Sequence, residues 1–226
     1  MDAGVMNAWQ LMLKGGPLMW LILFCSLIGM ALFLEKLSYF FSISADVIDL
    51  KTKVFNFIKQ NKLKDAIVLC EHNNSPVAKI MKAGIVKYGA SREDIKEAME
   101  GASLYEIPKL EKRLSVLSTI AHLAPLLGLL GTVVGMTVSF QAIQTRSLAM
   151  NPASSGDLAG GIWQALLTTV FGLIVAIPTL LAYNYCIARV NGFVIEMERA
   201  ATDVINLLSQ LSVASVSQEQ EEPREI

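Results

Sequence analysis

Four polar side chains inside long apolar segments are the best candidates in this chain for handling an ion. Thr132 lies in one such segment, and Gln164, Thr168 and Thr169 lie in another. A threonine hydroxyl does not take up a proton near neutral pH, so it can only solvate or orient a group that does. These residues predict a polar wall along an ion path, and helix packing is the alternative use of the same side chains.

Small residues recur around these positions at helical spacing. They are Gly128, Gly131, Gly135 and Ser139 in the first segment and Ala165, Gly172 and Ala176 in the second. Together with Thr132 and Thr169 they repeat every three or four residues, which places each set on one face of a helix. Such stripes are typical of closely packed membrane helices, and a pore wall in an oligomer is the second interpretation.

The apolar segments contain no charged side chain at bilayer depth. The segments 17–34, 116–143 and 162–187 contain no Asp, Glu, Lys or Arg. Ionisable groups inside a membrane are costly, and where they occur they mark ion pathways. A titrating carboxylate would therefore have to come from another chain.

Composition excludes several classes of protein. The chain has 226 residues, 53% of them hydrophobic, and a formal net charge of -1, which argues against a strongly basic nucleic-acid binder. Cys25, Cys70 and Cys186 are scattered, and His72 and His122 stand apart, so no disulfide framework, metal site or cofactor is expected. An enzyme is the least expected function, because no nucleophile–base or metal constellation appears.

The hydropathy pattern predicts an all-α integral membrane protein. It would have three transmembrane helices, long cytoplasmic extensions of the second and third, and a small cytoplasmic helical region. The expected order is an N-terminal outer-side interfacial segment (1–16), transmembrane helix 1 (17–41), a cytoplasmic helical region (42–113), transmembrane helix 2 (114–143), a periplasmic loop (144–161), transmembrane helix 3 (162–188), a cytoplasmic helix (189–214) and a disordered acidic tail (215–226).

Orientation follows from basic residues near the segment ends. Five lie on the side of residues 36–113 and the C-terminus, and two lie on the other side. This excess predicts a cytoplasmic C-terminus and a periplasmic N-terminus. Two alternatives concern the N-terminus: residues 1–16 could be a frayed end, and the first apolar segment could be a cleaved signal peptide, although an uncleaved anchor fits its flanks better.

A long helix is expected to lead into the second apolar segment. Ser91 and Asp94 resemble a capping box that opens it, and Ser75 resembles the N-cap of the preceding helix. Unbroken to residue 143, this helix would be about 80 Å long. Pro108 and Pro125 are expected to kink it without ending it, and Pro178 to kink the third segment.

His122 is the titratable residue closest to an apolar segment. It stands near the predicted cytoplasmic end of the second segment. A pH-sensing role is one interpretation, and an interfacial or packing histidine is the simpler one.

Two motifs in these segments resemble a known family. Residues 124–136 (APLLGLLGTVVGM) and 165–178 (ALLTTVFGLIVAIP), the latter followed by Ala182-Tyr-Asn184, are similar to the MotA/TolQ/ExbB proton-channel family, nearest its ExbB branch. The resemblance covers the order of the whole chain: one span, a helical cytoplasmic segment, and two spans joined by a short outer loop.

The resemblance implies a stator subunit of an ion-driven motor in the bacterial inner membrane. It implies a homopentamer around single-span partners of the ExbD/TolR type, whose membrane aspartate carries the ion past Thr132 and Thr169. Many members carry a glutamate five residues before the second threonine, where this chain has Gln164. That difference agrees with an acid supplied by the partner.

Three functions remain open from the sequence. The leading one is an ExbB-like subunit that uses proton flow to energise outer-membrane transport through a TonB-like protein. The second is a TolQ-like role in envelope maintenance, and the third is a non-conducting oligomeric scaffold in the lipid membrane. The residues do not separate TonB, Tol and gliding systems, or H⁺ from Na⁺.

Overall fold

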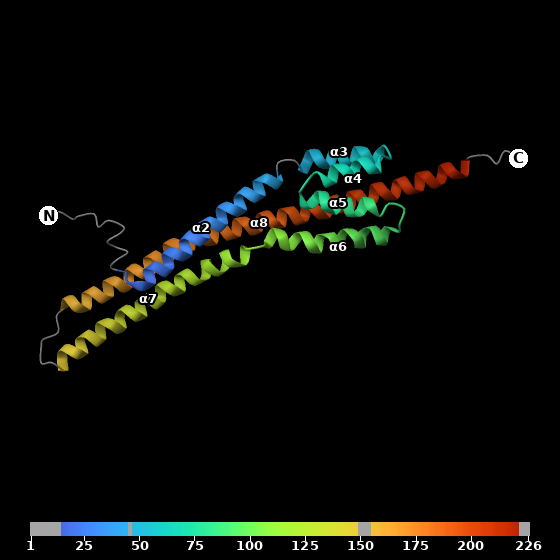
Figure 1. Ribbon diagram of the computed structural model, residues 1–226. Coiled ribbons are helices and arrows are strands. Elements are labelled where there is room, and N and C mark those ends of the chain that lie inside the picture. The colour runs from blue at the N-terminus through green and yellow to red at the C-terminus, as the bar shows by residue number, and fades with distance from the viewer. Residues whose placement is uncertain (1–14, 45–46, 149–154, 222–226) are drawn as a thin grey trace. The chain divides into compact units, whose positions relative to one another are not determined.

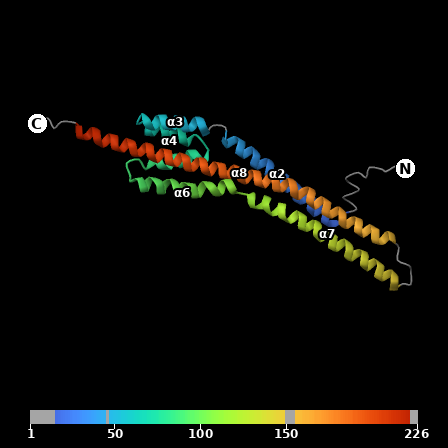
Figure 2. The ribbon, with the colours of Figure 1, turned by 180° about the vertical axis from the view of Figure 1, so that it is seen from behind.

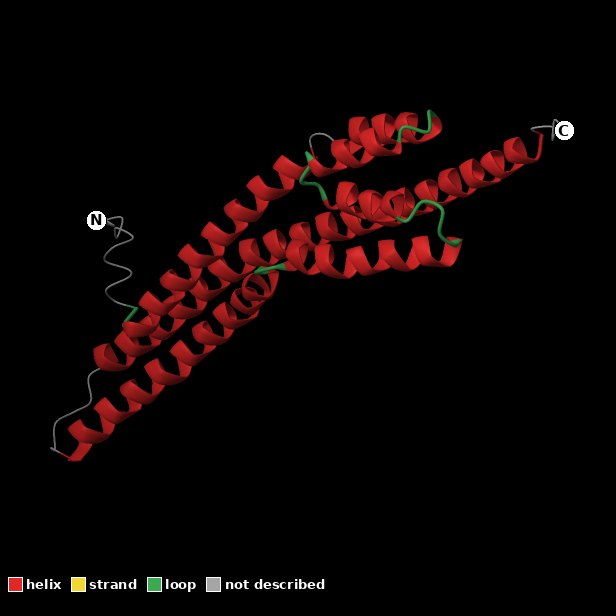
Figure 3. Ribbon diagram, turned by 45° about the vertical axis from the view of Figure 1, so that its right-hand side comes forward, coloured by secondary structure: helices red, strands yellow, loops and turns green. Residues whose placement is uncertain are grey.

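The computed structural model describes residues 15–44, 47–148 and 155–221, and within them every regular element is a helix (Figures 1 and 3). The helices are α2 (Pro17–Ser44), α3 (Val47–Lys59), α4 (Leu63–Glu71), α5 (Pro76–Val86), α6 (Arg92–Glu111), α7 (Leu114–Leu148) and α8 (Ser155–Glu221). Helices α2, α7 and α8 each contain a stretch long and apolar enough to cross a membrane. The predicted all-α membrane fold is confirmed.

The chain divides into two compact units. The first contains residues 1–36 and 113–186, and the second contains residues 37–112 and 187–226. In the first unit, α2 packs against α7 and α8 through a small apolar cluster. Its buried members are Ile22, Cys25, Ile120 and Leu127, with Ile28, Phe171 and Val175 packed against them. The outward faces of the same helices carry large apolar side chains such as Phe24, Leu129 and Leu181, which is the surface expected of helices in lipid.

In the second unit, α3 to α6 lie along the C-terminal part of α8 (Figure 2). Arg92 of α6 donates a hydrogen bond to Asn206 of α8 over 3.0 Å. The predicted N-caps are confirmed: the Ser75 hydroxyl accepts from the Ala78 amide, and Ser91 and Asp94 form a reciprocal capping box. These caps satisfy amides that helix starts leave without partners.

The predicted unbroken helix from residue 91 to residue 143 is wrong. Helix α6 ends at Glu111 and α7 begins at Leu114. Between them Lys112 is extended and Arg113 adopts the left-handed conformation, with φ 67°. Its side chain forms an ion pair with Glu35 of α2. The left-handed conformation costs a non-glycine residue about 1–2 kcal/mol, and glycine is the residue that usually marks it in a sequence. Because an arginine stands at this position, the sequence gives no signal for the break.

The three prolines lie inside helices. Pro108 is in α6, Pro125 in α7 and Pro178 in α8, and each helix continues past its proline. A kink at each of them stays a prediction.

Two helix ends differ from the expected boundaries. Helix α7 continues to Leu148 and α8 begins at Ser155, so both extend into the predicted loop 144–161, of which residues 149–154 lie outside the described residues. Helix α8 continues to Glu221, seven residues into the tail expected to be disordered from residue 215, because its Gln and Glu residues are good helix formers. The interfacial segment predicted for residues 1–16 falls almost wholly outside the described residues.

Candidate functional site

The small-residue stripes of α7 and α8 face each other within one chain. A Cβ atom placed on Gly128 would lie 2.9 Å from the Cα of Thr169, and one on Gly135 would lie 2.9 Å from the carbonyl oxygen of Gly161. A Cβ on Gly172 would lie 2.7 Å from the carbonyl oxygen of Ala124. These distances are too short for any side chain, so glycine is what allows the two backbones to touch.

Thr168 and Ser139 fill the space beside these glycines. Thr168 is 1% exposed and occupies the place that a side chain on Gly131 would take. Its hydroxyl donates to the carbonyl oxygen of Ala165 at 2.8 Å, and that of Ser139 donates to the carbonyl oxygen of Gly135 at 3.0 Å. Ala165 and Ala176 are buried as well. The structure therefore places Thr168 in a helix contact, away from the exposed surface of α8.

Thr169 connects the two helices through a hydrogen bond. Its hydroxyl oxygen lies 3.0 Å from the carbonyl oxygen of Gly128 in α7 and 3.5 Å from that of Ala165 in its own helix. The side chain is half-buried, so part of it remains accessible. Among the predicted ion-path residues, Thr169 is the one that bonds across the α7–α8 contact.

Thr132 lies one helical turn from the Gly128 carbonyl that Thr169 uses. It is half-buried, and its hydroxyl donates to the carbonyl oxygen of Leu129 at 2.6 Å. The two predicted threonines therefore border the same turn of α7. That these two threonines border an ion path stays a prediction.

Gln164, the fourth predicted ion-path residue, lies beside Gly16. Its amide nitrogen packs against Gly16, where a Cβ atom would collide with it, and Gly16 itself has φ 72°. The amide thus sits at the start of α2. The four predicted ion-path residues divide into Thr132 and Thr169 near Gly128, Thr168 in the helix contact, and Gln164 beside α2.

Sequence patterns missed two participants in the α7–α8 contact. The Ala124 carbonyl oxygen faces Gly172, and Gly161 faces Ser139 and the Gly135 carbonyl oxygen. Ala124 could have been found, since it stands four residues before Gly128 on the same helical face. The sequence predicts that Gly161 ends the loop 144–161, whereas α8 already begins at Ser155.

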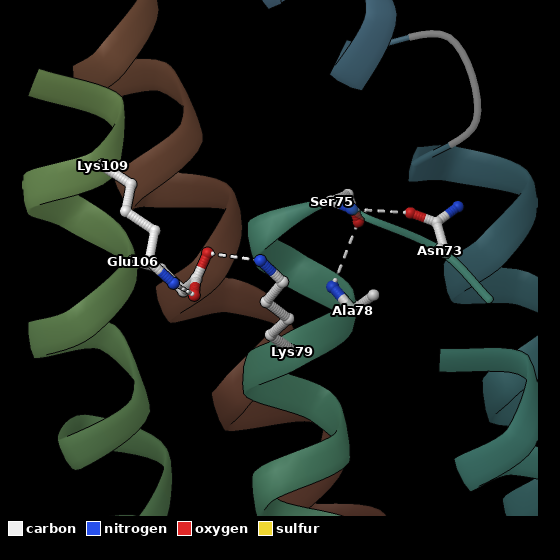
Figure 4. A network of polar contacts seen from close by, with 6 residues as sticks. All are labelled: Asn73, Ser75, Ala78, Lys79, Glu106 and Lys109. Carbon is white, nitrogen blue, oxygen red and sulfur yellow. Dashed lines mark hydrogen bonds and ion pairs between the residues drawn. The ribbon is translucent and has the colours of Figure 1, made fainter. Parts of the chain in front are cut away.

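A buried carboxylate in the second unit was also missed. Glu106 of α6 is 6% exposed, and it accepts hydrogen bonds from Lys79 of α5 at 3.0 Å and from Lys109 (Figure 4). Burial raises the pKa of Glu106, but the bonds from Lys109 and Lys79 outweigh it and hold the pKa below its usual value. The neighbouring Ser75 cap shown in the same view fixes the start of α5. Lys79 is distant in sequence, so no local pattern indicated this ion pair.

The described residues hold no group of three or more His, Cys, Asp or Glu side chains that could bind a metal ion. Cys70 is buried, and burial raises the pKa of its thiol to about 11, which makes it a poor nucleophile. His122 is exposed, and its Nδ1 atom lies 2.7 Å from the Ser118 carbonyl oxygen.

A family model described as the MotA/TolQ/ExbB proton channel family matches residues 72–199. The match includes both glycine motifs and the break between α6 and α7. The chain belongs to this family. It is thus a member of a group of membrane proton-channel motor subunits, which are transport proteins and not classical enzymes. With three apolar helices, it is a multi-pass membrane protein.

Curated relatives carry two kinds of name. A biopolymer transport protein of Synechocystis, ExbB-like 3, is 33% identical over 159 residues, which is 70% of this chain and 75% of the relative. The ExbB protein of Aquifex aeolicus is 32% identical over 118 residues, 52% of this chain and 76% of the relative. The Tol-Pal system protein TolQ of Haemophilus influenzae is 40% identical over 95 residues, 42% of this chain and 40% of the relative. The names do not separate the two branches.

Proposed function

We propose that this chain is an ExbB-like stator subunit of a proton-driven motor in a bacterial inner membrane. The observation that carries the proposal is the family match, which covers both glycine motifs. Thr169 of the second motif donates a hydrogen bond to Gly128 of the first. The excess of basic residues on one side supports a cytoplasmic C-terminus and a periplasmic N-terminus. The second unit would then lie in the cytoplasm.

The ion-carrying acid is supplied by a partner in this proposal. The apolar stretches of all three membrane helices lack a carboxylate, so the chain needs a single-span protein of the ExbD/TolR type with an aspartate in its span. Several copies of this chain, five by the family resemblance, would surround the partner. Thr132 and Thr169 would border the path of its aspartate.

The energy for such a motor comes from the membrane potential. One elementary charge crossing 100 mV releases about 2.3 kcal/mol, so repeated ion steps can drive movement of a partner. In the ExbB-like case this movement energises a TonB-like protein and, through it, outer-membrane transport. The relatives do not separate the ExbB-like role from the TolQ-like one, since an ExbB protein aligns with 52% of this chain and a TolQ protein with 51%, so growth assays decide between them.

The direct test is co-expression with a single-span, aspartate-bearing protein encoded nearby, followed by purification and growth assays. We expect a stable complex that supports siderophore- or vitamin-dependent growth in a strain lacking its own ExbB–ExbD pair. A complex that rescues only envelope defects would favour the TolQ-like alternative. Absence of any complex would contradict the motor proposal and favour a scaffold.

A further inference from the structure

We infer that a groove between α2 and α8 binds one phospholipid with an anionic headgroup, and that it holds an acyl chain of this lipid from a single leaflet of the bilayer. The groove lies within the first unit, and its volume is about 490 Å³. Sites for small ligands have volumes of about 300–1,000 Å³, so the groove is large enough for a specific site. Only the name of the leaflet rests on the proposed function, whose orientation makes it the cytoplasmic one.

Small side chains on both helices form the hollow of the groove. Gly29 of α2 and Ala182 of α8 line it, and a Cβ atom placed on Gly29 would lie 3.5 Å from the hydroxyl oxygen of Thr179. That hydroxyl donates to the carbonyl oxygen of Val175 at 2.7 Å, so its hydrogen is not available to a ligand. Larger apolar side chains complete the lining: Met30, Phe33, Ile174, Pro178 and Leu181. A concave apolar surface contacts a hydrocarbon chain on several sides at once, which a flat helix face does not.

The length and depth of the groove match one leaflet. It begins at the middle of the apolar segment in both helices, at Ser26 in α2 and at Ile174 in α8, and runs to Phe33 and Tyr185. The path from Ile174 to Tyr185 is about 16 Å long at 1.5 Å per residue, and half of the hydrocarbon core is about 15 Å thick. A membrane-spanning helix from a second copy or a partner would need the full thickness, so a single acyl chain fits the groove better.

The outer end of the groove carries the charge that an anionic headgroup requires. Tyr185 stands at this end, where aromatic side chains commonly meet the headgroups. Lys36 follows Phe33 by three residues in α2, and its positive charge is close enough to Cys186 of α8 to influence it. The groove also opens on the side of the membrane that has the excess of basic residues, five against two. Basic residues at the membrane surface attract anionic lipids.

The inference is tested by native mass spectrometry of the full chain in detergent micelles to which phosphatidylglycerol or phosphatidylcholine is added. The measurement is the fraction of chains that keep one lipid as the lipid concentration rises. Phosphatidylglycerol should bind about fivefold more tightly than phosphatidylcholine, the effect of one basic residue. Ala182→Phe should weaken binding about tenfold, because the ring overpacks against the acyl chain. Ser26→Leu should also weaken it, since it fills the inner end.

Ala31→Phe is the matched control, because Ala31 is exposed on α2 and does not line the groove. This variant should bind lipid as the wild type does. Wild-type binding in both groove variants, with helix content unchanged by circular dichroism, would overturn the inference. Equal weakening in Ala31→Phe would overturn it too, since lipid would then cover the helices without a specific site. Groove variants that lose their oligomers but keep their lipid would show that another helix fills the groove. None of these measurements needs the partner protein, so the proposed motor function is tested separately.

Discussion

Replacing Gly172 by alanine should destabilise the α7–α8 contact, although alanine is the better helix former. A Cβ atom on Gly172 would lie 2.7 Å from the carbonyl oxygen of Ala124 and 3.2 Å from the Cα atom of Gly128. Both neighbours are backbone atoms, so they can move only if the helices separate. Overpacking of this kind costs about 1–3 kcal/mol. The gain in helix propensity is about 0.5–1 kcal/mol, so the substitution should be destabilising overall.

Gly192→Ala provides the control in the same helix. A Cβ atom at Gly192 meets nothing within 4 Å, so only the gain in helix propensity should remain. We expect this variant to be more stable than the wild type by about 0.5–1 kcal/mol. The two variants should therefore differ in sign.

The measurement is the free energy of unfolding of the full chain in mixed detergent micelles. Unfolding is monitored by circular dichroism while a denaturing detergent is added. If Gly172→Ala were as stable as Gly192→Ala, the two backbones would not touch at Gly172. The description of the α7–α8 contact would then be wrong. Gly172→Leu, with its larger side chain, should prevent the contact and lower the yield of folded oligomer.

Four other outcomes follow. Thr169→Val should still assemble with the partner but fail to support transport-dependent growth. Thr168→Val should reduce growth less, because Thr168 lies in the helix contact. Growth at equal expression measures the coupling, and pull-down of the partner measures assembly. Glu106→Gln should lower the free energy of unfolding by about 1–3 kcal/mol at neutral pH, since it replaces a charged acceptor of two lysine bonds. Because the folded-state pKa of Glu106 is lowered, its contribution is present above the unfolded-state pKa and is lost as pH falls through the folded-state pKa; thermal melts of wild type and variant should therefore converge in acid. Cys70, with its pKa raised to about 11, should resist maleimide labelling at pH 8 until the protein is unfolded; rapid labelling of the native protein would show that Cys70 is accessible.

Much of the fold could be predicted because its signals are local. The capping box at Ser91, the N-cap at Ser75 and the long apolar stretches each depend on a few neighbouring residues. The break at Arg113 could not be predicted in this way. It depends on a left-handed arginine and on an ion pair with Glu35, and neither leaves a pattern in the surrounding sequence.

The residues of the α7–α8 contact could be predicted from the sequence, but the way in which they meet could not. Helical spacing placed Thr132, Thr169 and the glycines on shared faces, and it could not say which helix each face would meet. The structure shows that Gly128 and Gly172 meet within one chain. Hydrogen-bond direction at Thr169 depends on an oxygen 41 residues away, so it could be known only from the fold.

The central claim is that a partner protein supplies the ion-carrying carboxylate to this chain. Proton flux through reconstituted liposomes tests this claim most directly. Liposomes with this chain alone should hold an imposed pH gradient as well as empty liposomes do, because an apolar path without a carboxylate is a steep barrier to a proton. Liposomes with the chain and its aspartate-bearing partner should lose the gradient faster, and replacing that aspartate by asparagine should restore the barrier. Rapid collapse of the gradient with this chain alone would contradict the account.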